Sequence, residues 1–187
     1  MANTKQQYAD CKRKGELGEQ ACYSLCRAIT SQFTNIIDTR DIKKYRDADI
    51  DFVIQSPFSD LVFIEAKYAG IDGGADVFET EKNMTTGAAG WAIGSKAHYV
   101  TIYKEPMNEI HIIDMNKCRP FISSNLNNPR YKHYYKQTYS NYNNGQILYY
   151  TDNIRVPYAD LKANGIIAAI FSYKKNFWEQ TYIDQHR

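Results

Sequence analysis

The sequence predicts an α/β protein, and two segments carry that prediction. Residues 15–31 place Leu, Ala, Cys and Ile at helical spacing, which indicates one amphipathic helix. Residues 49–67 hold two short runs rich in Val, Ile and Phe around a segment with Pro and Ser, which is typical of a β-hairpin. Further strands are expected over 97–103 and 109–115, and residues 166–173 are expected to supply a last core element. We therefore expect helices packed against a β-sheet.

The hairpin carries the candidate functional residues. Side chains alternate between the two faces of a strand, so Glu65 and Lys67 share a face at the end of the second strand. Asp49 and Asp51 share a face of the first strand and compete for one role there. An acid, a base and a neighbouring Asp in apolar surroundings indicate a site, whereas a lone Glu-x-Lys is more often an exposed ion pair.

These residue types favour metal-assisted attack on a phosphodiester. Close carboxylates repel each other unless a cation lies between them. Oxygen ligands without a nearby Cys or His pair favour Mg²⁺ or Mn²⁺ over Zn²⁺, and one or two carboxylates suffice for Mg²⁺. Asp51 and Glu65 would hold the ion, which polarises the phosphate and lowers the pKa of a bound water. Lys67 would orient that water or offset charge on the phosphorus.

Asp51, thirteen further residues and then Glu65-Ala66-Lys67 resemble the D…E-x-K motif of the PD-(D/E)XK nuclease superfamily. That group includes restriction endonucleases, Holliday-junction resolvases and many phage nucleases. The resemblance implies a restriction-endonuclease-like fold, which is a central mixed sheet flanked by helices. It also implies a Mg²⁺-dependent DNA endonuclease that leaves a 5′-phosphate, with Mn²⁺ as a substitute and the Ala66 carbonyl as a further ligand. Asp51 is favoured over Asp49 because the apolar Phe-Val-Ile follows it, as in the motif.

The predicted helix supplies one more acidic residue. Lys14-Gly15, three residues and Glu19-Gln20 resemble the KGxxxER opening of the resolvases, although Gln20 replaces the usual Arg. The resemblance implies that Glu19 is both catalytic and a metal ligand, alongside Asp51 and Glu65. Helical spacing puts Glu19 at the margin of the apolar arc and Glu16 opposite that arc. Glu16 is the runner-up for this role, but complementing the dipole at a helix N-terminus explains Glu16 better than a role in the site does.

Basic residues surround this acidic centre, although the net charge is only +2. Residues 35–48 are expected to form a strand and then a basic loop. The stretch 95–99 resembles phage-type members of the superfamily, except that His98 replaces an Asp; we interpret His98 as structural rather than as a general base. Cations around an acidic centre suit a phosphate backbone. The predicted DNA-binding residues are Lys43, Lys44, Arg46, Lys96, Arg130 and Lys132.

The remaining segments complete one expected nuclease domain over residues 1–187. The glycine-rich, acidic residues 68–83 are expected to form a mobile loop, and a tightly packed helix is expected from Thr85 to Ile93. Residues 123–153 are dense in Tyr and Asn and predict a long loop or insertion. Such a segment either stacks on bases or forms a dimer interface.

Composition excludes several classes of protein. There is no apolar run near 18 residues and the N-terminus is polar, so we expect no membrane span and no signal peptide. The four cysteines lack zinc spacing, which favours a reduced, cytoplasmic protein, in the host cell if a phage encodes it.

The expected partners are DNA and a second copy in a homodimer. The alternative function is a catalytically inactive DNA-binding or inhibitory protein of the same fold, which the departures at Gln20 and His98 favour.

Overall fold

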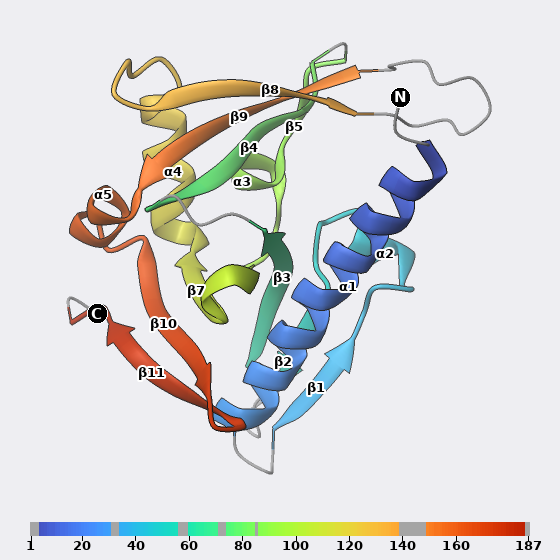
Figure 1. Cartoon of the computed structure of the whole chain (residues 1–187), viewed down its shortest axis with the longest axis vertical. Coiled ribbons are helices and arrows are strands. Elements are labelled where there is room, and N and C mark those ends of the chain that lie inside the picture. Colours follow the sequence, from blue (N-terminus) through green and yellow to red (C-terminus); the bar gives the residue numbers. More distant parts are fainter. Residues whose placement is uncertain are drawn as a thin grey trace.

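The chain folds into two β-sheets with helices packed around them, as the computed structural model shows (Figure 1). The structure describes residues 4–30, 34–55, 60–70, 74–84, 86–138 and 149–185, with the backbone alone for 4–8, 132–138 and 149. The helices are α1 (Thr4–Ile29), α2 (Lys43–Arg46), α3 (Trp91–Gly94), α4 (Met115–Asn125) and α5 (Tyr158–Ala163). The strands are β1 (Asn35–Asp38), β2 (Phe52–Gln55), β3 (Leu61–Ala69), β4 (Ala75–Asn83), β5 (Ala88–Ala89), β6 (Tyr99–Lys104), β7 (Glu109–Asp114), β8 (Lys132–Thr138), β9 (Tyr149–Pro157), β10 (Ile167–Lys174) and β11 (Phe177–Ile183).

The larger sheet confirms the expected mixed α/β architecture. Its strand order is β1-β2-β3-β6-β7-β10-β11. β3 and β6 run parallel, whereas the other neighbouring strands pair antiparallel. The hairpin is confirmed as β2 and β3, with Phe52 opposite Ile64. The Asp51 N–H then donates to the Ile64 carbonyl at 2.9 Å, so the same register brings Asp51 beside Glu65.

Helix α1 covers one face of this sheet (Figure 1). It begins at Thr4, well before the expected start at residue 15. Its apolar side is confirmed by Cys22 and Cys26, which are buried and pack against Phe52 and Ile64 of the hairpin. The amphipathic pattern of the sequence therefore fixes which side of α1 meets the sheet.

Gly18 lets α1 lie directly on β3. A Cβ atom at position 18 would come within 2.9 Å of the Lys67 carbonyl oxygen, closer than ordinary packing allows. One turn earlier, a Cβ atom at Gly15 would meet nothing within 4 Å. The absence of a side chain at Gly18 thus keeps the helix, and Glu19 with it, against the end of β3.

Gly18→Ala is expected to lower the free energy of unfolding by about 1–3 kcal/mol, because the added methyl forces α1 off β3. Gly15→Ala is the matched control, since it brings the same gain in helix propensity without a clash. It is expected to raise the free energy of unfolding by about 0.5–1 kcal/mol. Urea unfolding of both variants checks this, and equal stabilisation by the two substitutions would contradict the close contact.

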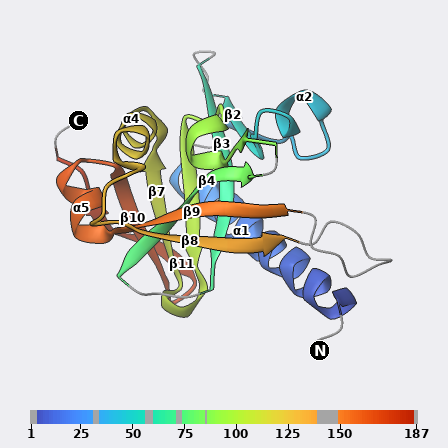
Figure 2. The ribbon, with the colours of Figure 1, turned by 90° about the horizontal axis from the view of Figure 1, so that it is seen from above.

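The opposite face of the larger sheet packs against a smaller sheet of order β5-β4-β9-β8 (Figure 2). Phe78 of β4 and Ile154 of β9 are fully buried there. They share one core with Val100 of β6, Ile113 of β7 and Ile122 of α4. The second sheet and α4 therefore cover the central strands β6 and β7 on this face.

The smaller sheet corrects two expectations. The acidic segment expected as a mobile loop forms β4, which pairs with β9. The segment 123–153 contains the end of α4, β8 and the start of β9 rather than one long loop, and 139–148 lies outside the described residues. β4 was missed because its inner face is half polar: Asp76 and Thr80 are buried beside Phe78. Such a face gives no apolar alternation.

Three smaller differences concern short elements. The helix expected from Thr85 to Ile93 is only α3, which follows the two-residue strand β5; Thr85 itself lies outside the described residues. The loop expected around Lys43 contains the short helix α2. β11 was not expected. It follows β10 through a tight hairpin turn in which Lys175 and Asn176 both have positive φ.

The other expected strands are confirmed within a few residues. The strands expected at 97–103 and 109–115 correspond to β6 and β7, and the core element expected at 166–173 is the strand β10. β9 ends at Pro157 and α5 follows directly, as the sequence there indicates. Within the described ranges, no helix combines the length and the apolar character that crossing a membrane requires.

Candidate functional site

The end of the hairpin brings Asp51, Glu65 and Lys67 together. The Lys67 ammonium forms an ion pair with Glu65 Oε1. Asp51 Oδ2 accepts a hydrogen bond from the Ala66 N–H at 2.7 Å, so Ala66 contacts Asp51 through its amide rather than its carbonyl. This bond fixes the Asp51 carboxylate against β3. Three of the four candidate catalytic residues therefore lie at one point of the sheet.

Glu65 is buried, and burial disfavours the ionised form of its carboxylate. Its side chain is only 2% exposed, and Oε2 has no hydrogen-bond partner among the described residues. Burial raises the pKa of Glu65 to about 7 and the charge of Asp49 raises it further, while Lys67 and the nearby Ser95 hydroxyl favour the ionised form. A buried carboxylate oxygen without a partner favours the arrival of a cation or a proton.

Asp51 and Lys67 respond to the same surroundings. Burial raises the pKa of Asp51, against the Ala66 N–H and the Lys67 charge, which lower it. Burial also disfavours the Lys67 ammonium, but Glu65, Asp51 and Asp49 outweigh it and the pKa of Lys67 is raised. Lys67 therefore stays protonated at neutral pH, which suits offsetting negative charge rather than accepting a proton.

Two acidic residues outside the motif also reach this point. Asp49 lies near enough to raise the pKa of Glu65 and forms an ion pair with Lys82 at 3.6 Å. Glu79 of β4 is half-buried; burial raises its pKa, while Lys67 lowers it. Sequence reasoning left Asp49 as an alternative to Asp51 and missed Glu79 and Lys82, because nothing local indicates that β4 lies beside the hairpin.

Glu19 points inward from α1 but is already paired. It forms an ion pair with Arg40, which also binds Asp38 at 2.5 Å. A hollow of about 330 Å³ opens beside this ion pair. Burial raises the pKa of Glu19, against Arg40, and the nearby Asp51 raises it further. Glu16 is exposed and pairs with Lys12 at 3.8 Å, so helical spacing correctly separated the two glutamates.

These residues meet part of what a divalent ion needs. Within the described ranges, no three His, Cys, Asp or Glu side chains are gathered as ligands. Asp51 and the free oxygen of Glu65 are nevertheless hard donors on adjacent strands, and Mg²⁺ fills its remaining positions with water. Glu19 would have to leave Arg40 to join them. The donor set fits Mg²⁺ with the carboxylates of Asp51 and Glu65, and Glu19 would be the third once its ion pair with Arg40 opens.

The predicted DNA-binding residues divide into two groups. Lys43, Lys44 and Arg46 are exposed on α2, and Lys96 is exposed nearby, since its N–H donates to the Ala48 carbonyl at 2.9 Å. These four therefore flank the start of β2. Arg130 pairs with Asp160 at 2.5 Å on another part of the surface. Lys132 begins β8, and its side chain lies outside the described atoms.

His98 holds the edge of β3 rather than taking part in the site. Its Nδ1 accepts a hydrogen bond from the Phe63 N–H at 3.2 Å, and its ring stacks on Phe63 with centroids 4.9 Å apart. The His98 N–H in turn donates to the Phe63 carbonyl at 2.8 Å. These contacts agree with the structural interpretation of His98.

The raised pKa of Glu65 has a consequence for stability. Because the folded pKa lies above the unfolded value of 4.5, the folded state loses stability as pH rises from 4.5 through about 7. Between about pH 5 and about pH 7, the free energy of unfolding of metal-free protein should therefore fall by about 2 kcal/mol more in wild type than in Glu65→Gln. Denaturant unfolding across that range checks it, and parallel pH profiles would contradict it.

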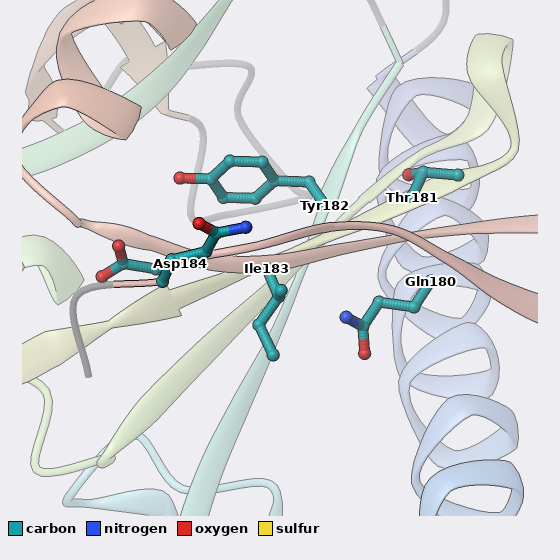
Figure 3. Close-up of a pocket in the computed structure, with 6 residues that line it drawn as sticks. Gln180, Thr181, Tyr182, Ile183 and Asp184 are labelled. Atoms are coloured by element: carbon teal, nitrogen blue, oxygen red, sulfur yellow. The ribbon is translucent and has the colours of Figure 1, made fainter.

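A second hollow lies far from these residues in the sheet. It has a volume of about 540 Å³ and runs along Gln180–Gln185, at the β11 edge of the larger sheet (Figure 3). Its one acidic residue, Asp184, is paired with Lys117 at 2.9 Å. This hollow therefore offers no reactive cluster comparable to that of the hairpin.

Comparison with known proteins gave no relative for this chain. No family profile matched it, and neither did any curated protein or any solved structure.

Proposed function

We propose that the protein is a Mg²⁺-dependent DNA endonuclease of the PD-(D/E)XK superfamily. One observation carries the proposal: Glu65 presents a buried oxygen without a partner, with Asp51 on the adjacent strand and Lys67 beside it. Two neighbouring carboxylates could hold a metal ion that activates water and polarises the phosphate, and the ammonium could offset the charge that builds up there. The mixed sheet with helices on both faces is compatible with the fold of that superfamily.

Each residue has a role in this proposal. Asp51 and Glu65 would hold Mg²⁺, which polarises the phosphate and lowers the pKa of its bound water. The Ala66 N–H orients Asp51. Lys67 offsets the charge that builds on the phosphorus, and Glu19 completes the acidic group after leaving Arg40. The exposed cations beside the start of β2 bind the phosphate backbone. They are Lys43, Lys44, Arg46 and Lys96.

Incubation with supercoiled plasmid, branched DNA and single-stranded DNA tests this function. We expect cleavage in Mg²⁺ or Mn²⁺ and none in EDTA, with 5′-phosphate ends on the products. We also propose a homodimer, because two sites cut both strands in one encounter; linear plasmid should then form without a nicked precursor. Failure to cut any of the three DNAs with either metal would remove the assignment.

The second candidate is a DNA-binding or inhibitory protein without catalysis. The ion pair between Glu19 and Arg40 favours it, because that pair keeps the third carboxylate from the other two. Calorimetric titration with Mn²⁺, together with a DNA-binding assay, separates the candidates. Binding of metal and DNA with no cleavage would favour this second function over the nuclease.

A further inference from the structure

We propose that Arg119 of α4 is a positioning residue of this site, acting through the Ser95–His98 segment, which holds the start of β2. The inference rests on the proposed function, because it concerns the same carboxylates. Arg119 touches none of them. Its effect passes from α4 to the segment, and from the segment to Asp49 before β2 and to Phe63 of β3.

The Arg119 guanidinium binds backbone carbonyls of the Ser95–His98 segment. Its Nη2 donates to the Ser95 carbonyl at 2.8 Å and to the Ala97 carbonyl at 2.5 Å, and its Nε also reaches Ser95 O at 3.2 Å. Its Nη1 donates to the Met115 carbonyl at 3.3 Å, within its own helix. A planar guanidinium with five fixed donors can bridge several carbonyls at once. Arg119 therefore fixes the segment to the first turn of α4.

The segment in turn is bonded to the residues that precede β2 and to β3. Ser95 Oγ donates to the Asp49 carbonyl at 3.1 Å, and the Lys96 N–H donates to the Ala48 carbonyl at 2.9 Å. On the other side, His98 exchanges hydrogen bonds with the Phe63 backbone. The segment thus sets how the residues before β2 lie relative to β3.

Asp49 is the residue that most needs such a hold. Its φ of 51° is in the left-handed region, which costs a residue with a Cβ atom energy, although Asp adopts it more readily than most residues do. The direction of the chain at Asp49 decides where Asp51 and the Asp49 carboxylate lie relative to Glu65. A displacement there would separate the ligands of the proposed metal without unfolding the sheet.

Arg119→Met, Arg119→Lys and a matched control, Lys117→Met, test the proposal. Lys117 lies on the same helix and binds Asp184 at 2.9 Å, so its loss removes a comparable contact on α4 away from the site. Each protein is compared by thermal unfolding, by the Mg²⁺ concentration that gives half-maximal cleavage, by calorimetry with Mn²⁺, and by hydrogen exchange of the Lys96 and His98 amides.

Arg119→Met should raise the Mg²⁺ concentration that gives half-maximal cleavage, which we call the metal midpoint, by about 10- to 100-fold. Loss of a residue that orients metal ligands has an effect of this size. Saturating Mg²⁺ should restore most of the turnover, and the two amides should exchange faster. Arg119→Lys should fall between Arg119→Met and wild type, because an ammonium cannot bridge two carbonyls in the same geometry. Lys117→Met should lower the melting temperature while leaving the metal midpoint and both amides unchanged.

Unchanged metal midpoint and amide exchange in Arg119→Met, with only a lower melting temperature, would overturn the proposal. An equal rise in the metal midpoint in Lys117→Met would also overturn it. If wild type neither binds Mn²⁺ nor cuts DNA, the nuclease proposal fails instead. In that case the exchange of Lys96 and His98 still decides whether Arg119 holds the segment, so the two failures are distinguishable.

Discussion

Asp51→Asn is expected to lower Mg²⁺-dependent DNA cleavage by about a thousandfold, because a bound metal supplies several kcal/mol of transition-state stabilisation and each 1.36 kcal/mol is a factor of ten. The substitution preserves size, and an asparagine oxygen can still accept the Ala66 N–H that Asp51 accepts now. The change therefore removes one negative charge and little else. Plasmid cleavage and calorimetric titration with Mn²⁺ measure the loss, and both should fall together.

Lys67→Met should separate these two measurements. Removing the ammonium that pairs with Glu65 leaves both carboxylates in place and takes away the cation that competes with Mg²⁺. We expect cleavage to fall by at least about a hundredfold, as the loss of one preorganised electrostatic contact does, while Mn²⁺ binding is kept or strengthened. Wild-type cleavage in both Asp51→Asn and Lys67→Met would remove these residues from the site.

The hairpin and the helix on it could be predicted because their signals are local. Alternation over 49–67 gave the strands, and the register that follows brings Asp51 beside Glu65. Helical spacing likewise predicted the buried side of α1 and placed Glu19 at the margin of that side. In both elements the apolar pattern itself decides which side faces the core, so a single segment contains the information.

The rest of the site depends on partners distant in sequence. Glu79 reaches the hairpin only because β4 pairs with β9, more than 70 residues later. Arg40 stands between α1 and β1, and Arg119 binds the 95–98 segment from α4. No spacing rule relates these positions. The charged groups that tune a site are therefore the part that sequence pattern alone misses.

A buried polar cluster joins the two sheets and explains why β4 gave no apolar signal. Asp76 of β4 accepts from His111 Nδ1 of β7 at 2.9 Å and forms an ion pair with Lys104 of β6. All three side chains are at most 1% exposed. The Lys104 ammonium also donates to the Ala75 carbonyl at 3.3 Å and lies 5.3 Å from the centre of the Tyr158 ring.

Asp76→Asn is expected to lower the free energy of unfolding by about 3–5 kcal/mol, because it leaves a buried ammonium without its counter-ion. Glu179→Gln is the matched control. Glu179 pairs with Lys174 at 3.4 Å, but both side chains are at least half exposed. Such a pair is worth at most about 1 kcal/mol, so this variant should unfold nearly as wild type does. Similar losses in the two variants would contradict the role given to the cluster.

Acid should remove the difference between Asp76→Asn and wild type. Burial opposes the ionisation of Asp76, but His111 and Lys104 outweigh it, and the pKa of Asp76 lies below the unfolded value of 3.8. The ionised carboxylate therefore stabilises the fold above that value, and this stability is lost as pH falls through the folded pKa. Urea unfolding of both proteins from about pH 6 to about pH 2 should show their curves approaching each other only below about pH 4. A constant gap would mean that the loss in Asp76→Asn comes from altered packing and not from the missing charge.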